Sequence, residues 1–178
     1  MKNITLTKLR KELKFKSRED LQADIELLFK QFPQVKKHYT MLYESSGIDE
    51  VLEEAKQKIH KEFHGNARYG CPRASIKDAK KVITNFKKLP VTDENIIDLM
   101  LCYVDELLGF IREYGVGYDT NYPDSCASMF ESAIKIIQKN QLYYHYENIL
   151  KDLLRKADDG YVEDIEFLYD EYFGENQQ

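Results

Sequence analysis

The sequence predicts an all-α protein of about eight helices, packed as antiparallel pairs around a central buried helix at residues 96–114. Three observations support this class. Apolar residues recur at helical spacing through most of the chain. No segment shows the period-two alternation of a strand with one exposed face. Only four prolines and eight glycines occur among 178 residues, 43% of which are hydrophobic, so we expect one domain, residues 1–178.

The first part of the chain contains three predicted helices before residue 45. Leucines at helical spacing indicate a short helix at residues 6–13, which needs tertiary contacts to be stable. Ser17, with an acidic residue three positions later, has the form of an N-cap and begins the second helix. Pro33 suits the first turn of the third, which Ser45-Ser46-Gly47 is expected to stop. Asp49 is expected to begin the fourth helix.

The fourth helix is expected to end at Gly65, where the irregular loop 65–74 begins. Ser75, again with an acidic residue three positions later, predicts the N-cap of a fifth helix. Leu89-Pro90 ends it, because the residue before a proline disfavours helical geometry.

The central helix is the longest apolar segment. Its apolar residues cover an arc of roughly 200° when placed at 100° per residue, so it must be covered on two sides. Acidic residues on the remaining stripe, including Asp98, Asp105 and Glu106, argue against a membrane span. Thr92 is its predicted N-cap, and Gly115 is expected to end it.

Three further helices are predicted after the loop 115–124. Pro123 begins the first, a turn near Asn140 separates it from the second, and Gly160 separates the second from the third. The sequence shows no repeat with a period of 34 to 47 residues. An irregular bundle and a short helical-repeat-like solenoid therefore both fit the pattern.

Charge is divided unevenly along the chain. Residues 1–90 contain 20 Lys and Arg against 12 Asp and Glu, whereas residues 91–178 contain 6 against 19, so the overall −5 combines +8 with −13. Most of the positive excess lies in residues 56–88, where ten basic side chains accompany two acidic ones. This basic segment is where an anionic partner, if the protein has one, would bind.

Cysteine content and the N-terminal residues predict the compartment. The three cysteines Cys71, Cys102 and Cys126 are odd in number and lack short metal-binding spacing, which favours a reducing environment. The first residues are basic but contain no apolar segment or cleavage site of a secretory signal. We therefore expect a cytoplasmic protein outside the membrane.

Two irregular segments, the loops 65–74 and 115–124, are the expected binding surfaces. Together with the basic helix after the first loop, they contain the side chains expected to bind a partner: Arg68, Tyr69, Arg73, Lys77, Lys80, Lys81, Tyr118 and Tyr122. The alternatives are basic residues that meet the acidic helices within the fold or in a head-to-tail assembly, and tyrosines that lie half-buried over the core.

His60 and His64 lie one helical turn apart, so their imidazoles are close enough to share a metal ion. In the HExxH motif of zinc proteases, Glu follows the first His directly, and Lys61 occupies that position here. If the pair held a metal, a soft third ligand could come only from Cys71 across the loop. The preferred interpretation is instead two exposed histidines on a basic helix face. No metal or cofactor is therefore expected.

Cys126 lies near a predicted helix N-terminus, where the helix dipole stabilises a thiolate. No histidine adjoins it in the sequence, so a small buried residue is the preferred interpretation for Cys126 and for Cys102. The pair Gly115 and Gly117 follows a helix rather than a strand, which excludes a dinucleotide-binding loop. The sequence thus contains no arrangement typical of a catalytic site.

Five segments occur in order along the chain: TLTKLRKELK, LEEAKQKIHKEF, IKDAKKVITNFKKL, DLMLCYVDELLGFIREYG and SMFESAIKII. Together they resemble a family of small bacterial proteins catalogued only as a domain of unknown function. The resemblance covers most of the chain and is one of overall helical pattern. It implies a cytoplasmic bacterial helical protein and assigns no activity, cofactor or catalytic residue.

The sequence therefore favours a non-enzymatic interaction or scaffold module that presents the loops 65–74 and 115–124 to a protein partner. Nucleic acid or another polyanion, bound through residues 56–88, is the alternative. A small metal- or thiol-dependent enzyme is the third hypothesis. A homo-oligomer is compatible with each of them.

Overall fold

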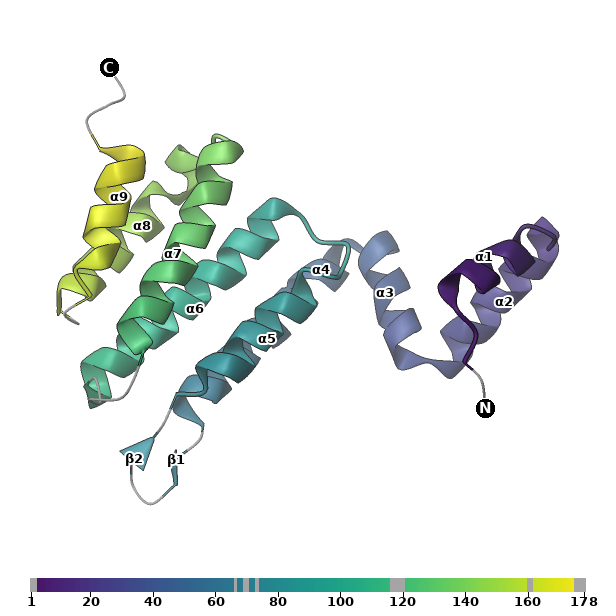
Figure 1. Ribbon diagram of the computed structural model, residues 1–178, viewed down its shortest axis with the longest axis horizontal. Helices are drawn as coiled ribbons and strands as arrows, with labels where there is room; N and C mark the ends of the chain where they lie inside the picture. The colour runs from purple at the N-terminus through teal and green to yellow at the C-terminus, as the bar shows by residue number, and fades with distance from the viewer. Residues whose placement is uncertain are drawn as a thin grey trace. The chain divides into compact units, whose positions relative to one another are not determined.

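The all-α class is confirmed by a computed structural model of the chain (Figure 1). It describes residues 3–65, 67–68, 71–72, 74–115, 121–159 and 162–174. The described helices are α1 (Leu6–Leu13), α2 (Arg18–Gln31), α3 (Pro33–Tyr43), α4 (Ser45–His64), α5 (Ile76–Phe86), α6 (Asp93–Tyr114), α7 (Tyr122–Lys139), α8 (Tyr143–Asp159) and α9 (Asp164–Phe173).

Contacts divide the chain into two compact units. The first unit is Met1–Gly47 and the second is Ile48–Gln178. The expectation of one domain over residues 1–178 stays a prediction.

Local signals mark the helix starts in the first unit, and those at Ser17 and Pro33 were predicted. Thr5 accepts a hydrogen bond from the backbone N–H of Lys8 at the start of α1. Ser17 and Asp20 form a reciprocal capping box at the start of α2, with distances of 3.0 and 3.3 Å. Pro33 lies in the first turn of α3, as predicted. Local hydrogen bonding therefore determines where these helices begin.

The first unit buries few of its apolar side chains. Neither α1 nor α2 contains a buried residue, and α3 contains one, Met41. The apolar residues of α2 that recur at helical spacing include exposed Ile25, Leu28 and Phe29. The helices of this unit therefore form without a packed core of their own.

The start of α4 differs from the prediction. The segment Ser45-Ser46-Gly47 was expected to be a turn, but these residues are already helical, and α4 begins at Ser45. Extended Glu44 alone separates α3 from α4. A Cβ atom at Gly47 would lie 3.0 Å from the carbonyl oxygen of Thr40, so this glycine permits a close approach instead of stopping a helix.

Helix α6 is the centre of the second unit, as predicted for residues 96–114. It buries ten side chains: Ile97, Leu99, Met100, Leu101, Tyr103, Val104, Leu107, Leu108, Phe110 and Ile111. It packs against α5, α7 and α8, and α7 also packs against α8 and α9 (Figure 1). On another side, Phe63 of α4 contacts Tyr103 edge to face at 5.1 Å. These contacts form an irregular bundle.

The ends of α6 are determined locally. Thr92 and Asn95 form a reciprocal capping box at its start. Gly115 ends it with a φ of +75°, a conformation that glycine adopts at low cost. None of the described helices combines the length and apolar composition needed to cross a bilayer.

The predicted loop 65–74 contains a short β-ladder. Strands β1 (Ala67–Arg68) and β2 (Cys71–Pro72) pair in antiparallel register. Two residues are too few to produce a detectable alternation, which explains why the pattern showed no strand. Ser75, which follows this ladder, was predicted to cap the backbone of α5. Its side chain instead donates a hydrogen bond to the Asp78 carboxylate, so this prediction was wrong.

Replacing Gly109 with alanine tests the cost of a glycine inside the core helix. A Cβ atom at this position of α6 meets nothing within 4 Å. We expect Gly109→Ala to raise the free energy of unfolding by about 0.5–1 kcal/mol, because alanine loses less backbone entropy on folding.

The matched control is Gly65→Ala, at the end of α4. Its Cβ would lie 2.6 Å from the carbonyl oxygen of Lys61, so we expect destabilisation by about 1 kcal/mol or more. Urea denaturation measures both changes. Equal effects of the two substitutions would contradict this explanation.

Candidate functional site

The basic residues predicted to bind a partner are only partly described. Lys77 and Lys81 are exposed on α5, and Lys80 is half-buried. Arg68 lies in β1, but its side chain is outside the described residues, as are Tyr69, Arg73 and Tyr118. The binding role of these residues stays a prediction.

Tyr122, one of the side chains expected to bind a partner, is instead mostly buried. Its side chain is only 6% exposed, and its ring meets that of Phe110 edge to face at 5.5 Å. Its hydroxyl donates to the carbonyl oxygen of Ala74 at 3.5 Å. The apolar ring therefore belongs to the core between α6 and the residues before α5.

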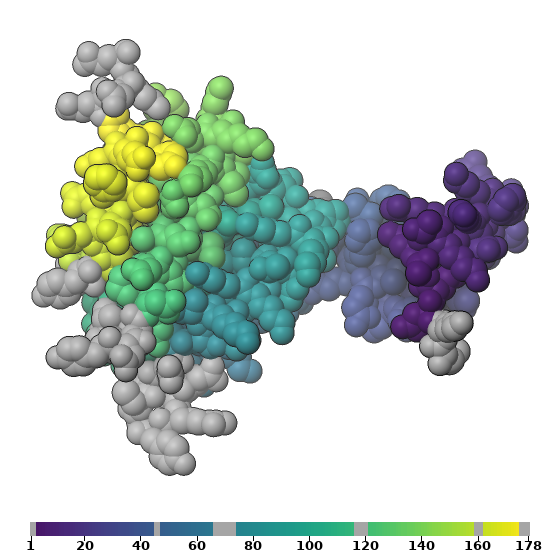
Figure 2. Space-filling model, viewed as in Figure 1, coloured from purple at the N-terminus to yellow at the C-terminus, as the bar shows by residue number. Residues whose placement is uncertain are grey.

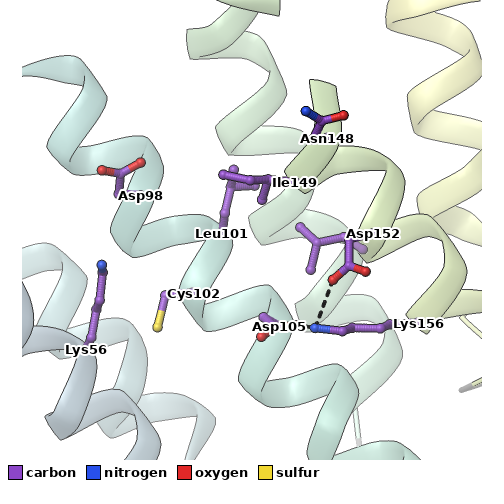
Figure 3. Close-up of a pocket in the computed structure, with 10 residues that line it drawn as sticks. Lys56, Asp98, Leu101, Cys102, Asp105, Asn148, Ile149, Asp152 and Lys156 are labelled. Atoms are coloured by element: carbon purple, nitrogen blue, oxygen red, sulfur yellow. Dashed lines mark hydrogen bonds and ion pairs between the residues drawn. The ribbon is translucent and has the colours of Figure 1, made fainter. Parts of the chain in front are cut away.

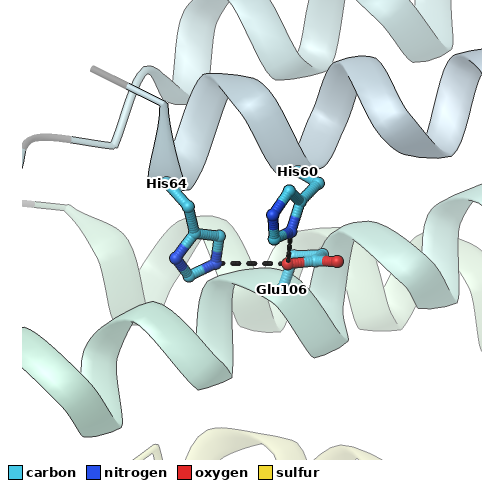
Figure 4. A group of neighbouring side chains, drawn as sticks. All are labelled: His60, His64 and Glu106. Carbon is cyan, nitrogen blue, oxygen red and sulfur yellow. Dashed lines mark hydrogen bonds and ion pairs between the residues drawn. The ribbon is translucent and has the colours of Figure 1, made fainter. Parts of the chain in front are cut away.

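Three side chains from two helices form a compact polar cluster, shown in Figure 4. His60 Nδ1 lies 2.9 Å and His64 Nε2 lies 3.2 Å from the same carboxylate oxygen, Oε2 of Glu106. The two imidazoles stack at a centroid distance of 4.8 Å. One ligand atom from each residue lies within 4.8 Å of the other two.

The geometry of this cluster follows from the packing of α4 on α6. Ile59 and Phe63 directly precede the two histidines and are fully buried. Residues one turn apart share a helix face, so this buried pair holds both imidazoles at the edge of the α4–α6 contact. His64 is further held against Phe110, with 5.9 Å between ring centroids.

The two histidines were predicted as candidate ligands from their spacing, whereas Glu106 was not. Cys71 was considered as the third ligand, because it follows the histidines closely in sequence. Glu106 lies 46 positions after His60. The sequence places Glu106 on the polar stripe of the central helix. That position does not indicate which other helix faces the stripe.

A cavity of about 580 Å³ opens beside the cluster. Its lining includes Asp105, Leu108, Gly109, Arg112, Glu113 and Lys156, in addition to the three cluster residues. Lys156 is already paired with Asp105 at 2.5 Å and with Asp152 at 3.1 Å. Those hydrogen bonds, chiefly that to Asp105, raise the pKa of Lys156. Its ammonium group therefore stays protonated, and the two carboxylates balance its positive charge.

A second cavity of about 610 Å³ lies between α4, α6 and α8 (Figure 3). Lys56, Asp98 and Cys102 lie on one side of it, and Asp152 and Lys156 on the other. Lys56 pairs with Glu53 at 2.8 Å. This cavity therefore has a charged rim and contains one thiol.

Burial makes both described free thiols poor nucleophiles. It raises the pKa of the Cys102 thiol to about 12, with a further contribution from nearby Glu106. Burial also raises the pKa of Cys126, whose Sγ lies 3.8 Å from the carbonyl oxygen of Val104. Nucleophilic catalysis requires the thiolate, so neither environment activates a cysteine.

The reactivity of Cys102 tests this conclusion. In a Cys71→Ser variant at pH 8.5, we expect Cys102 to react with iodoacetamide more than about 100-fold more slowly than free cysteine, because the raised pKa leaves little thiolate. Peptide mass spectrometry measures the rate at each cysteine. A Cys102 rate close to that of the free amino acid would contradict the assigned environment.

Comparison with known proteins identifies one family. No curated protein and no solved structure matches the chain. A family model described as "Family of unknown function (DUF6155)" matches residues 4–170, which is most of the chain and includes nearly all of the first unit and the histidine–glutamate cluster. The protein therefore belongs to this family of unknown function.

Proposed function

We propose that the protein is a non-enzymatic, cytoplasmic interaction module and that its first unit supplies the binding surface. One observation carries this proposal: most of the exposed large apolar side chains of the described chain lie before residue 45. They are Ile4, Leu6, Leu9, Phe15, Ile25, Leu27, Leu28, Phe29, Phe32, Leu42 and Tyr43. Figure 2 shows this unit in purple and blue.

Covering the exposed apolar side chains of the first unit is energetically favourable. Fully covering one Leu or Phe side chain stabilises a fold or complex by about 1.5–3 kcal/mol. An isolated helix of eight residues, such as α1, is marginal in water. A surface that covers α1 and α2 therefore stabilises both the unit and the complex, and exposed apolar groups of this extent mark interaction sites.

The charge of the same unit indicates the chemistry of the partner. Residues 1–47 contain ten Lys and Arg against six Asp and Glu. The partner we propose is a protein with an apolar contact surface bordered by acidic groups, because such a border complements the basic side chains. The loops 65–74 and 115–124, also expected to bind the partner, lie partly outside the described residues and add no support.

Site-specific photo-crosslinking in cells tests this surface. The photoreactive analogue p-benzoylphenylalanine replaces Phe15 or Phe29 in the first unit, or Phe167 of α9 as the matched control, since all three are exposed phenylalanines. We expect one discrete protein adduct from Phe15 and Phe29, several-fold more abundant than any adduct from Phe167. Introducing Leu9→Glu should remove it, because the charge is costly at an apolar interface.

The mass of the adduct identifies the partner. An increase of 21.0 kDa would indicate a second copy of the chain and would overturn the choice of a different protein. Equal labelling from all three positions, or none from the first unit, would overturn the proposed surface.

A second candidate function is polyanion binding through the lysines of α5. Lys77, Lys80 and Lys81 lie on one helix, and within the described residues none of them takes part in an ion pair with a carboxylate. Unpaired lysines grouped in this way attract phosphate groups through a salt-dependent, sequence-independent interaction.

Fluorescence anisotropy with a 20-base-pair DNA duplex tests this candidate. We expect Lys77→Glu combined with Lys81→Glu to weaken binding at 50 mM salt by about tenfold or more, because two phosphate contacts become repulsive. Lys135→Glu is the control, since Lys135 is exposed but already paired with Glu131 at 2.6 Å. Absence of binding by the unaltered protein at low salt would exclude the candidate.

A further inference from the structure

His60, His64 and Glu106 have the donor types and the arrangement of a transition-metal site. Two imidazole nitrogens and one carboxylate oxygen form the protein ligand set of many zinc sites and of non-haem iron sites that retain open positions. Here two ligands come from adjacent turns of α4 and the third from α6. Each helix is held by buried residues, so the cluster lies on a rigid part of the second unit.

The distances fit an ion of this class. Bonds from Zn²⁺ to nitrogen and oxygen measure about 2.0–2.2 Å, so two ligand atoms of a tetrahedral site lie roughly 3.3 Å apart. The two histidine nitrogens lie 2.9 and 3.2 Å from Glu106 Oε2. Small side-chain rotations therefore suffice to place all three ligand atoms around one ion, with each imidazole proton on its other nitrogen.

The surroundings leave room for further ligands. Besides Glu106, the charged groups that line the cavity are acidic Asp105 and Glu113 and basic Arg112 and Lys156. Lys156 is itself paired with Asp105 and Asp152. His60 is 61% exposed, which leaves the cluster open to an ion from solvent. The cavity of about 580 Å³ beside it has space for water or a small anionic ligand at the remaining positions.

We propose that His60, His64 and Glu106 bind one divalent first-row transition-metal ion, of which Zn²⁺ is the representative, and that this ion links α4 to α6. Imidazole ligands favour Zn²⁺, Co²⁺ and Ni²⁺ over Mg²⁺ and Ca²⁺. The competing explanation is a pair of hydrogen bonds from the two imidazoles to one carboxylate, with no role for a metal. This inference is independent of the interaction surface in the first unit.

Titration of the chelator-treated full chain with Zn²⁺ and Co²⁺ distinguishes these explanations. Calorimetry should give one Zn²⁺ per chain, with much weaker binding of Mg²⁺. The Co²⁺ form should absorb in the visible region and lack the intense near-ultraviolet band of thiolate ligands. Zn²⁺ should also raise the melting temperature, because an ion that binds only the folded state stabilises it.

Substitutions assign the ligands. We expect His60→Gln, His64→Gln and Glu106→Gln each to weaken Zn²⁺ binding by at least about tenfold, since loss of outer-shell partners alone costs that much. Glu113→Gln in the same cavity, His145→Gln on α8 and Cys71→Ser serve as controls and should leave the affinity within about twofold. Circular dichroism of each variant confirms that it is folded.

Histidine side-chain NMR of the unaltered chain provides a readout that needs no variant. Addition of Zn²⁺ should shift the imidazole signals of His60 and His64 and leave those of His38 and His145 unchanged. No binding of Zn²⁺ or Co²⁺, binding that survives Glu106→Gln and His64→Gln together, or shifts confined to other histidines would each overturn the proposal.

Discussion

Burial of α6 is the physical constraint on which the second unit depends. Ten of its side chains are buried, and each full burial stabilises the fold by about 1.5–3 kcal/mol. Such a helix requires neighbours on several sides, which α4, α5, α7 and α8 supply. Because most of its circumference is covered, its few polar residues emerge where neighbouring helices meet. This places Cys102, Asp105 and Glu106 beside cavities.

The two units differ in how they satisfy their apolar residues. The second unit has a closed core in which buried hydroxyl groups are hydrogen-bonded: the hydroxyls of Ser125 and Tyr103 lie 2.7 Å apart. The first unit leaves the apolar side chains of α1 and α2 exposed. Exposed apolar surface of this extent is typical of interaction sites.

The second unit contains two kinds of potentially reactive side chain, its thiols and its histidine–glutamate cluster. Burial raises the pKa of the thiols of Cys102 and Cys126, which disfavours the reactive thiolate. The histidine–glutamate cluster is instead accessible and contains good metal ligands. An ion bound there would connect two helices that hydrophobic packing already brings together. Because this cluster lies in the second unit and the proposed interaction surface in the first, the two can be tested separately.

The sequence by itself determined the features that depend on neighbouring residues. The capping boxes at Ser17 and Thr92, the turn at Gly115 and the apolar face of α6 all arise within one or two helical turns. Tertiary structure decided the rest. Glu106 meets His60 across 46 positions, Tyr122 enters the core, and the apolar face of α2 stays exposed. Helical periodicity shows which face of a helix is apolar, but only packing decides which neighbour covers that face.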